Sequence, residues 1–167
     1  MKYIPFLQSS RRVLSDQEIA NKMLHIMLGS ERRSSLHRQV AAQLPVGGWN
    51  ETIARHLLDG LVRQLNAGAG VVSEMDTAMQ KAHDTAKKGK IDYEYPNLLS
   101  AGMSLTALGM LTIVMPEAVA ALGFKEVEPT TNSFADIWQR TYPNIRYRAF
   151  YRYLHVLESG GKWRGTA

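Results

Sequence analysis

A run of 22 consecutive residues without a formal charge, 95–116, limits the fold of this chain more than any other feature. As one α-helix it would be about 33 Å long, at about 1.5 Å per residue, which is enough to cross the hydrocarbon core of a membrane. Serine, threonine, glycine and alanine residues dilute its apolar character. A helix that is apolar on all sides can also be the buried centre of a helical bundle. Periodicity alone therefore leaves both structures open.

The flanks of this run favour a membrane-spanning helix over 97–115. Tyr93 and Tyr95 stand just before it, and tyrosines are common at the membrane–water interface. Small residues, which let a second transmembrane helix approach, recur along one face: Gly102, Thr106 and Gly109. The residues expected within the span are Leu98, Leu99, Gly102, Met103, Leu105, Thr106, Leu108, Gly109, Leu111, Ile113 and Val114.

Capping residues and amphipathic spacing predict helices in the rest of the chain. Ser15 and Glu18 form a capping box before an apolar stripe, and Asn50 and Ser133 are placed to cap later helices. The clearest expected helices are 16–28, 51–66 and 74–88, and weaker ones lie near 31–44 and in the tail. No segment alternates as a strand would. We predict an all-α protein with about six helices, divided into a basic N-terminal helical region, 1–47, and a helical domain, 48–167.

The formal net charge of +5 is concentrated at the two ends of the chain. Residues 1–48 carry seven basic and three acidic side chains, and residues 124–167 carry seven and four. A basic excess of this size suits an anionic membrane surface or a nucleic acid, and it also serves solubility alone.

The tail, 133–158, is both basic and aromatic. This composition fits the headgroup region of a membrane, a single-stranded nucleic acid, or a helix that packs its apolar side inward and keeps its arginines in water. Nucleic acid is the least favoured of the three. The residues expected to contact lipid phosphates or to lie at an interface are Lys87, Lys88, Lys90, Tyr93, Tyr95, Trp138, Arg146, Arg148 and Arg152.

The residue chemistry names no catalytic site. The chain has no cysteine, which excludes a disulfide, a thiolate zinc site and a cysteine nucleophile. None of the five histidines lies three or four residues from another, so no helix face presents two imidazoles to a metal. Gly68 and Gly70 lack the third glycine of a dinucleotide fingerprint. We expect no cofactor, no metal and no enzymatic activity, although an enzyme with a scattered site stays open.

An ordered series of short motifs follows residue 47. Gly48-Trp49 opens an amphipathic segment, Tyr95-Pro96 precedes the uncharged run, and Leu122-Gly123-Phe124 follows it. An acidic step before a proline, 126–129, leads to the run Ser-Phe-Ala-Asp-Ile-Trp-Gln-Arg-Thr-Tyr at 133–142. In this order, over about residues 48–155, the chain resembles fungal proteins of the interferon-inducible 6-16-like family. The resemblance implies a small helical membrane protein without catalytic residues. It also implies a mitochondrial or endoplasmic reticulum membrane and an association with cell death or innate defence.

We therefore predict a small, non-enzymatic helical protein inserted in or bound to an intracellular membrane, with the lipid bilayer as its main partner. A homo-oligomer or a protein partner is also compatible with this prediction. Secretion is not expected, because Pro5 breaks an N-terminal apolar run that is too short for a secretory signal. The alternatives are a helical bundle that binds a protein partner around a central core helix at 97–115, a nucleic-acid module that uses the tail, and a small helical enzyme.

Overall fold

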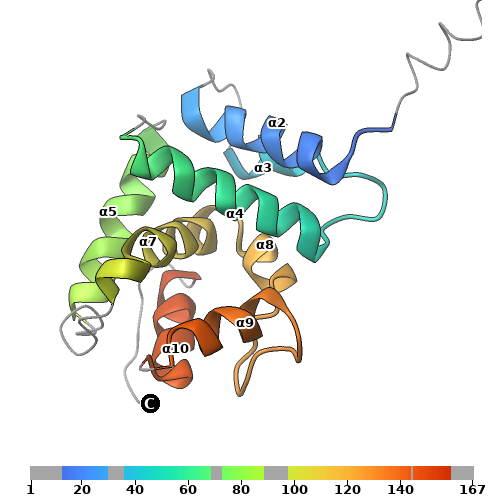
Figure 1. Ribbon diagram of the computed structural model, residues 1–167. Helices are drawn as coiled ribbons and strands as arrows, with labels where there is room; N and C mark the ends of the chain where they lie inside the picture. The colour runs from blue at the N-terminus through green and yellow to red at the C-terminus, as the bar shows by residue number, and fades with distance from the viewer. Residues whose placement is uncertain (1–12, 30–35, 69–72, 89–97, 144, 159–167) are drawn as a thin grey trace, which may run out of the picture.

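The computed structural model describes residues 13–29, 36–68, 73–88, 98–143 and 145–158, and over these residues it contains helices and no strands (Figure 1). The all-α prediction is confirmed. The helices there are α2 (Asp16–Gly29), α3 (Leu36–Ala41), α4 (Glu51–Asn66), α5 (Ser73–Lys88), α7 (Leu98–Val114), α8 (Pro116–Ala121), α9 (Phe134–Thr141) and α10 (Tyr147–Glu158). These eight helices exceed the six or so predicted, in part because Pro116 divides the apolar region into α7 and α8. Met115, the residue before the proline, leaves the helical conformation.

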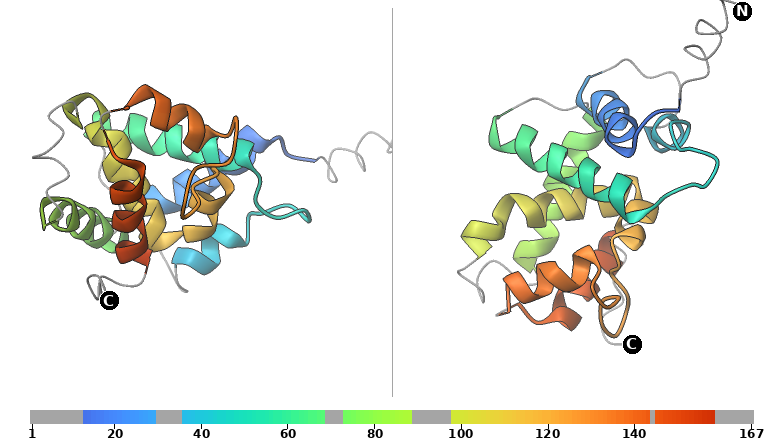
Figure 2. Two further views of the ribbon diagram at one scale, coloured as in Figure 1. Left: turned by 90° about the horizontal axis from the view of Figure 1, so that it is seen from below. Right: turned by 45° about the vertical axis from the view of Figure 1, so that its right-hand side comes forward.

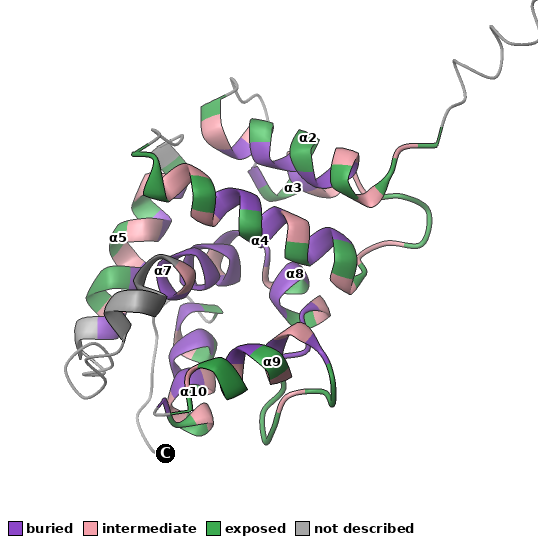
Figure 3. Ribbon diagram, in the orientation of Figure 1, coloured by how far each residue is buried: buried purple, intermediate pink, exposed green. Residues whose placement is uncertain are grey.

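Helix α7 lies at the centre of the bundle, where α4, α5, α8 and α10 all contact it (Figure 1). Helix α2 packs on α4, and α3 packs beside α2, as the turned views show (Figure 2). The buried side chains form one hydrophobic core that runs from Ile19 in α2 to Leu157 in α10. In Figure 3, buried stretches of α2, α4, α7, α8 and α10 are coloured purple. The predicted N-terminal region and the predicted C-terminal domain thus both contribute to the same core.

The predicted membrane span is a core helix in this structure. Between Leu105 and Met115 every residue is buried except Ile113, which is half-buried. A helix that is apolar on all sides needs a cover on all sides, and here four neighbouring helices provide it. The prediction of a span over 97–115 is corrected for this reason. Among the described helices, none combines the length and the apolar character that crossing a membrane requires.

The small-residue face of α7 is occupied by helices of the same chain. A Cβ atom added at Gly109 would lie 2.7 Å from the Cβ of Ala82 in α5 and 2.5 Å from the hydroxyl oxygen of Tyr153 in α10. That hydroxyl donates to the backbone oxygen of Ala82 at 3.3 Å. Thr106 forms a hydrogen bond of 3.1 Å with the Nε2 atom of His83 in α5. The expectation that this face receives a second transmembrane helix is therefore wrong at Thr106 and Gly109.

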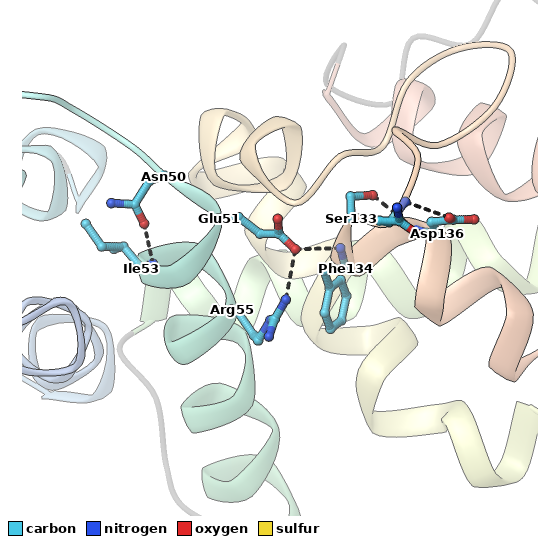
Figure 4. Close-up of polar contacts among 8 residues, drawn as sticks. Asn50, Glu51, Ile53, Arg55, Ser133, Phe134 and Asp136 are labelled. Carbon is cyan, nitrogen blue, oxygen red and sulfur yellow. Dashed lines mark hydrogen bonds and ion pairs between the residues drawn. The ribbon is translucent and has the colours of Figure 1, made fainter.

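The predicted caps form as the sequence indicates. The amide of Glu18 donates to the hydroxyl of Ser15, and the carboxylate of Glu18 accepts from the amide of Ser15, which completes the capping box of α2. Asn50 accepts from the amide of Ile53 at 2.8 Å and caps α4 (Figure 4). Ser133 accepts from the amide of Asp136 and caps α9. Local sequence therefore determines where three of the helices begin.

A long-range contact joins the starts of α4 and α9. One carboxylate oxygen of Glu51 accepts from the amide of Phe134 at 2.6 Å and from the guanidinium of Arg55 at 2.9 Å (Figure 4). Glu51 thus satisfies a free amide at the first turn of α9, where the partial positive charge of the helix also favours a carboxylate. This contact holds the start of α9, in the C-terminal part of the chain, against the start of α4.

Candidate functional site

Helix α10 turns its apolar side to the core and its charged side to water. Phe150, Tyr153, Leu154 and Leu157 are buried, at the spacing of one helix face. The opposite side is exposed and carries Arg148, Arg152, His155 and Glu158. Of the alternatives for the basic aromatic tail, this arrangement matches a helix that packs its apolar side inward and keeps its arginines in water.

The aromatic side chains of the tail pack around Phe124. Its ring centroid lies 5.5 Å from that of Phe150 and 6.2 Å from that of Trp138, and Trp138 stacks on Phe150 at 4.6 Å. Only 5% of Trp138 is exposed. Trp138 therefore takes a place in the core instead of the interfacial place expected for it, because the rings of Phe124, Tyr142 and Phe150 pack against it.

The loop after Phe124 is held against the start of α10. The hydroxyl of Tyr147 accepts from the amide of Lys125 at 2.7 Å and donates to the backbone oxygen of the same residue. Burial raises the pKa of Tyr147 to about 12, although the hydrogen bond with the Lys125 backbone opposes the rise. The neutral phenol is the form that can donate, so the raised pKa extends the hydrogen bond from Tyr147 to the Lys125 backbone oxygen to a higher pH than an ordinary tyrosine would allow.

Two adjoining hollows form a groove along the exposed side of α10. The first has a volume of about 380 Å³ and lies between α10 and the loop at 126–127. The second has a volume of about 300 Å³, extends toward α8, and shares Tyr151 and His155 with the first. We call the two together the α10 groove, which is lined by Thr112, Pro116, Glu117, Val119, Ala120, Phe124, Glu126, Val127, Arg148, Tyr151, Arg152, Leu154, His155 and Glu158.

The charges around this groove have both signs. Arg148 and Arg152 line the first hollow together with Glu126, whereas Glu117 and Glu158 line the second. Burial, and then the negative charges of Glu158 and Glu126, raise the pKa of Tyr151. The carboxylates at the two ends thus both act on the phenol between them.

Glu117 also connects the groove to the N-terminal helices. Its carboxylate lies 3.1 Å from the Nε2 atom of His37 in α3, and about half of each side chain is exposed. An exposed pair of this kind contributes little to stability, about 0–1 kcal/mol. Its importance is geometric, because it places α3 beside the acidic end of the groove.

A third hollow of about 410 Å³, separate from the α10 groove, lies between α4, α7 and α9. Among its lining residues are Arg63, Ser104, Ile137 and Trp138. Ile137 is one of the large apolar side chains that are exposed in the described part of the chain. We call this hollow the comparison hollow.

The remaining predicted residues divide into three groups. Arg146, Arg148 and Arg152 are exposed, as a surface contact requires. Leu105, Thr106, Leu108, Gly109, Leu111 and Val114 are buried within the bundle, and Ile113 is half-buried. Lys90, Tyr93 and Tyr95 lie outside the described residues, as do the side chains of Lys87, Lys88, Leu98, Leu99, Gly102 and Met103.

The sequence did not indicate most of the groove. Glu117, Glu126 and Val127 come from α8 and from a loop, far from α10 in the chain, and no motif connects them. The signal that was available is the spacing of Arg148, Arg152 and His155, which places all three on one helix face. Among the described residues, no three or more His, Asp or Glu side chains are grouped to hold a metal ion.

No protein-family model, curated protein or solved structure matches this chain. The resemblance to the 6-16-like family therefore stays a prediction based on the ordered motifs.

Proposed function

We propose that this protein is a non-enzymatic helical bundle that binds a segment of a protein partner in the α10 groove. One observation carries the proposal: two adjoining hollows of about 380 and 300 Å³ follow one helix and combine apolar side chains with charged ones. Val127, which is 67% exposed, and the half-buried Tyr151 provide apolar surface, and arginines and glutamates surround it. Apolar surface within a charged rim is the usual anatomy of a protein interface.

A concave groove with both signs of charge suits a protein segment better than a bilayer. An anionic membrane presents one sign of charge over a broad surface, so Glu117, Glu126 and Glu158 would face like charges there. A polypeptide can present acidic and basic side chains a few residues apart, and can match both. The apolar residues of α7 from 105 to 114 are already covered by the bundle itself, apart from the half-buried Ile113.

Peripheral binding to an intracellular membrane is the second candidate. It is favoured by the exposure of Arg146, Arg148 and Arg152 in and just before α10. Each cation near an anionic leaflet contributes about 1 kcal/mol, and the attraction is screened by salt. The organelle that the family resemblance implies, a mitochondrion or the endoplasmic reticulum, belongs to this candidate.

A peptide selection on the full-length protein tests the first candidate. A random peptide library displayed on phage is selected on the wild-type protein, and enriched peptides are then measured on two double variants. Arg148→Glu/Arg152→Glu reverses two charges in the groove. The control, Lys22→Glu/Arg63→Glu, makes the same change in net charge on α2 and at the comparison hollow of α4.

The proposal predicts peptides that bind the wild-type and the control alike and bind the groove variant at least about tenfold more weakly, the effect of about 1.4 kcal/mol. Peptides that bind both double variants equally well would contradict it, and so would failure to enrich any peptide. Flotation with phosphatidylserine vesicles tests the second candidate. Salt-sensitive flotation that is lost only in the groove variant would favour the membrane over the protein partner.

A further inference from the structure

The charged side chains of α10 are sorted by sign along the helix axis. Arg148 and Arg152 lie in the first half of the helix, and Glu158 is its last residue, with His155 between them. Their separations of four, three and three residues keep all four near one face. The stripe spans ten residues, or about 15 Å at about 1.5 Å per residue.

The opposite wall of the α10 groove reinforces this order at the far end. Glu117 from α8 lines the same hollow as Glu158, which brings two carboxylates to that end. At the near end, the lining residues that the structure describes carry two basic side chains, Arg148 and Arg152, and one carboxylate, that of Glu126. The groove is therefore basic at the start of α10 and acidic at its end.

The dipole of α10 has the same sense as these side chains. The amino end of a helix carries a partial positive charge and the carboxyl end a partial negative one. The arginines lie toward the amino end and Glu158 lies at the carboxyl end, so backbone and side chains add to one gradient. A ligand with charge of a single sign would be attracted at one end of the groove and repelled at the other.

The two hollows meet at Tyr151 and His155, which line both of them. The half-buried ring of Tyr151 is the apolar surface at this junction. An aliphatic side chain of a partner can be buried here between the two charged ends. About 15 Å corresponds to four or five residues of extended chain, at about 3.3 Å per residue.

We infer that the α10 groove binds a short protein segment with an acidic residue at the Arg148–Arg152 end, an aliphatic residue in the middle and a basic residue at the Glu117–Glu158 end. This inference rests on the proposed function and specifies its partner. The inference fixes the ends and leaves the chain direction open: a segment that begins with its acidic residue and one that ends with it match the same charges in opposite chain directions.

Three capped pentapeptides of equal length, each with leucine in the middle, test the inference by NMR titration of the full-length, ¹⁵N-labelled protein. One peptide has an acidic and a basic end, one has two acidic ends, and one has two basic ends. We expect the dipolar peptide to bind about five- to tenfold more tightly than either of the others, since each mismatched end replaces an attraction by a repulsion. The shifted signals should lie in α10 and at 124–127.

Two charge reversals should redirect this preference in opposite ways. Arg148→Glu/Arg152→Glu should bind the peptide with two basic ends most tightly, and Glu117→Lys/Glu158→Lys, which reverses both carboxylates of the far end, should bind the one with two acidic ends most tightly. A gain of binding for a new peptide cannot result from unfolding or loosening of the variant. The control Lys22→Glu/Arg63→Glu should keep the preference of the wild-type protein.

The outcomes separate this inference from the proposed function. Equal binding of all three peptides would overturn the inferred order of acidic and basic residues. It would also be overturned if none of the three binds while phage-selected peptides still bind in the groove. In both cases the proposed function stands. If neither the pentapeptides nor any selected peptide binds, and phosphatidylserine vesicles alone shift the α10 signals, both the inference and the protein-binding function are wrong.

Discussion

Replacement of Gly109 by alanine tests how closely α5 and α10 pack on the central helix. The added methyl group would lie 2.5 Å from the hydroxyl of Tyr153, 2.7 Å from the Cβ of Ala82 and 3.2 Å from Cδ1 of Leu157. The Cβ of Ala82 is bonded directly to the backbone of α5, so no side-chain rotation can move it away from the added methyl group. Helix α5 must therefore shift as a whole, or α7 must rotate.

The magnitude follows from three contributions. Overpacking of a core by one methyl group costs about 1–3 kcal/mol. Displacement of Tyr153 weakens its hydrogen bond to Ala82, which costs about 1 kcal/mol more. Alanine in place of glycine within a helix stabilises the helix by about 1 kcal/mol, which offsets part of this cost. Gly109→Ala should therefore lower the free energy of unfolding by about 1–3 kcal/mol.

Gly60→Ala in α4 is the matched control. Its added Cβ would lie 2.7 Å from Cδ2 of Leu24, the far end of a flexible side chain that can turn aside. The gain in helix propensity then balances the small cost of repacking. We expect Gly60→Ala to stay within about 1 kcal/mol of the wild-type protein.

Urea unfolding followed by circular dichroism measures both variants. For a chain of this size, a loss of 1–3 kcal/mol corresponds to a fall in Tm of about 2–12 °C, which a thermal melt checks independently. If Gly109→Ala is as stable as Gly60→Ala, α7 does not pack against Ala82 and Tyr153, and the reasoning fails.

Three further changes have defined outcomes. Gly123 has a φ of +101° and an added Cβ there would collide with Ser133, so Gly123→Ala should cost at least about 2 kcal/mol in a urea melt. Asn50→Ala removes the cap of α4 and should cost about 1 kcal/mol, whereas Asn50→Ser should be nearly neutral. The folded protein holds the phenolic proton of Tyr147 more tightly than the unfolded chain does. The contribution of this group to stability should therefore be complete and independent of pH below about pH 10 and should be lost as the pH rises toward 12. The fall should be smaller in Tyr147→Phe, and an identical pH profile for the variant would contradict this.

The helices and their starts were readable from the sequence because they depend on neighbours in the chain. The capping box at Ser15 and the cap at Asn50 need partners only three residues away. The amphipathic stripe of α4 likewise shows directly which side is buried. These are the features that local propensity and periodicity determine.

The environment of α7 could not be predicted from the sequence, because a helix that is apolar on all sides can be covered either by lipid or by protein. Lipid and protein side chains satisfy such a surface equally well. The covering helices come from segments on both sides of α7 in the chain, and their approach depends on Gly109 and Ala82 being small together. That pairing is a property of two helices and is not visible in either alone.

The groove was only partly predictable for the same reason. The exposed arginines of α10 follow from helical spacing, and Arg148 and Arg152 lie where a surface contact was expected. Glu126 reaches the groove through the turn at Gly123 and the hydrogen bonds of Tyr147 with Lys125. Trp138 was misplaced because a tryptophan beside arginines is equally typical of an interface and of an aromatic core.

Thiol accessibility is the most direct test of the central claim, that the apolar helix is covered by its own bundle. The chain has no cysteine, so single substitutions report without background. Ala107 is fully buried in α7, and Ala120 in α8 is exposed. In detergent-free buffer, Ala107→Cys should react with a water-soluble maleimide at least about a hundredfold more slowly than Ala120→Cys, as an opening free energy of about 3 kcal/mol implies, and urea should abolish the difference. Equal reaction rates in buffer, with Ala107→Cys protected only after lipid vesicles are added, would contradict the account and restore the membrane-spanning helix.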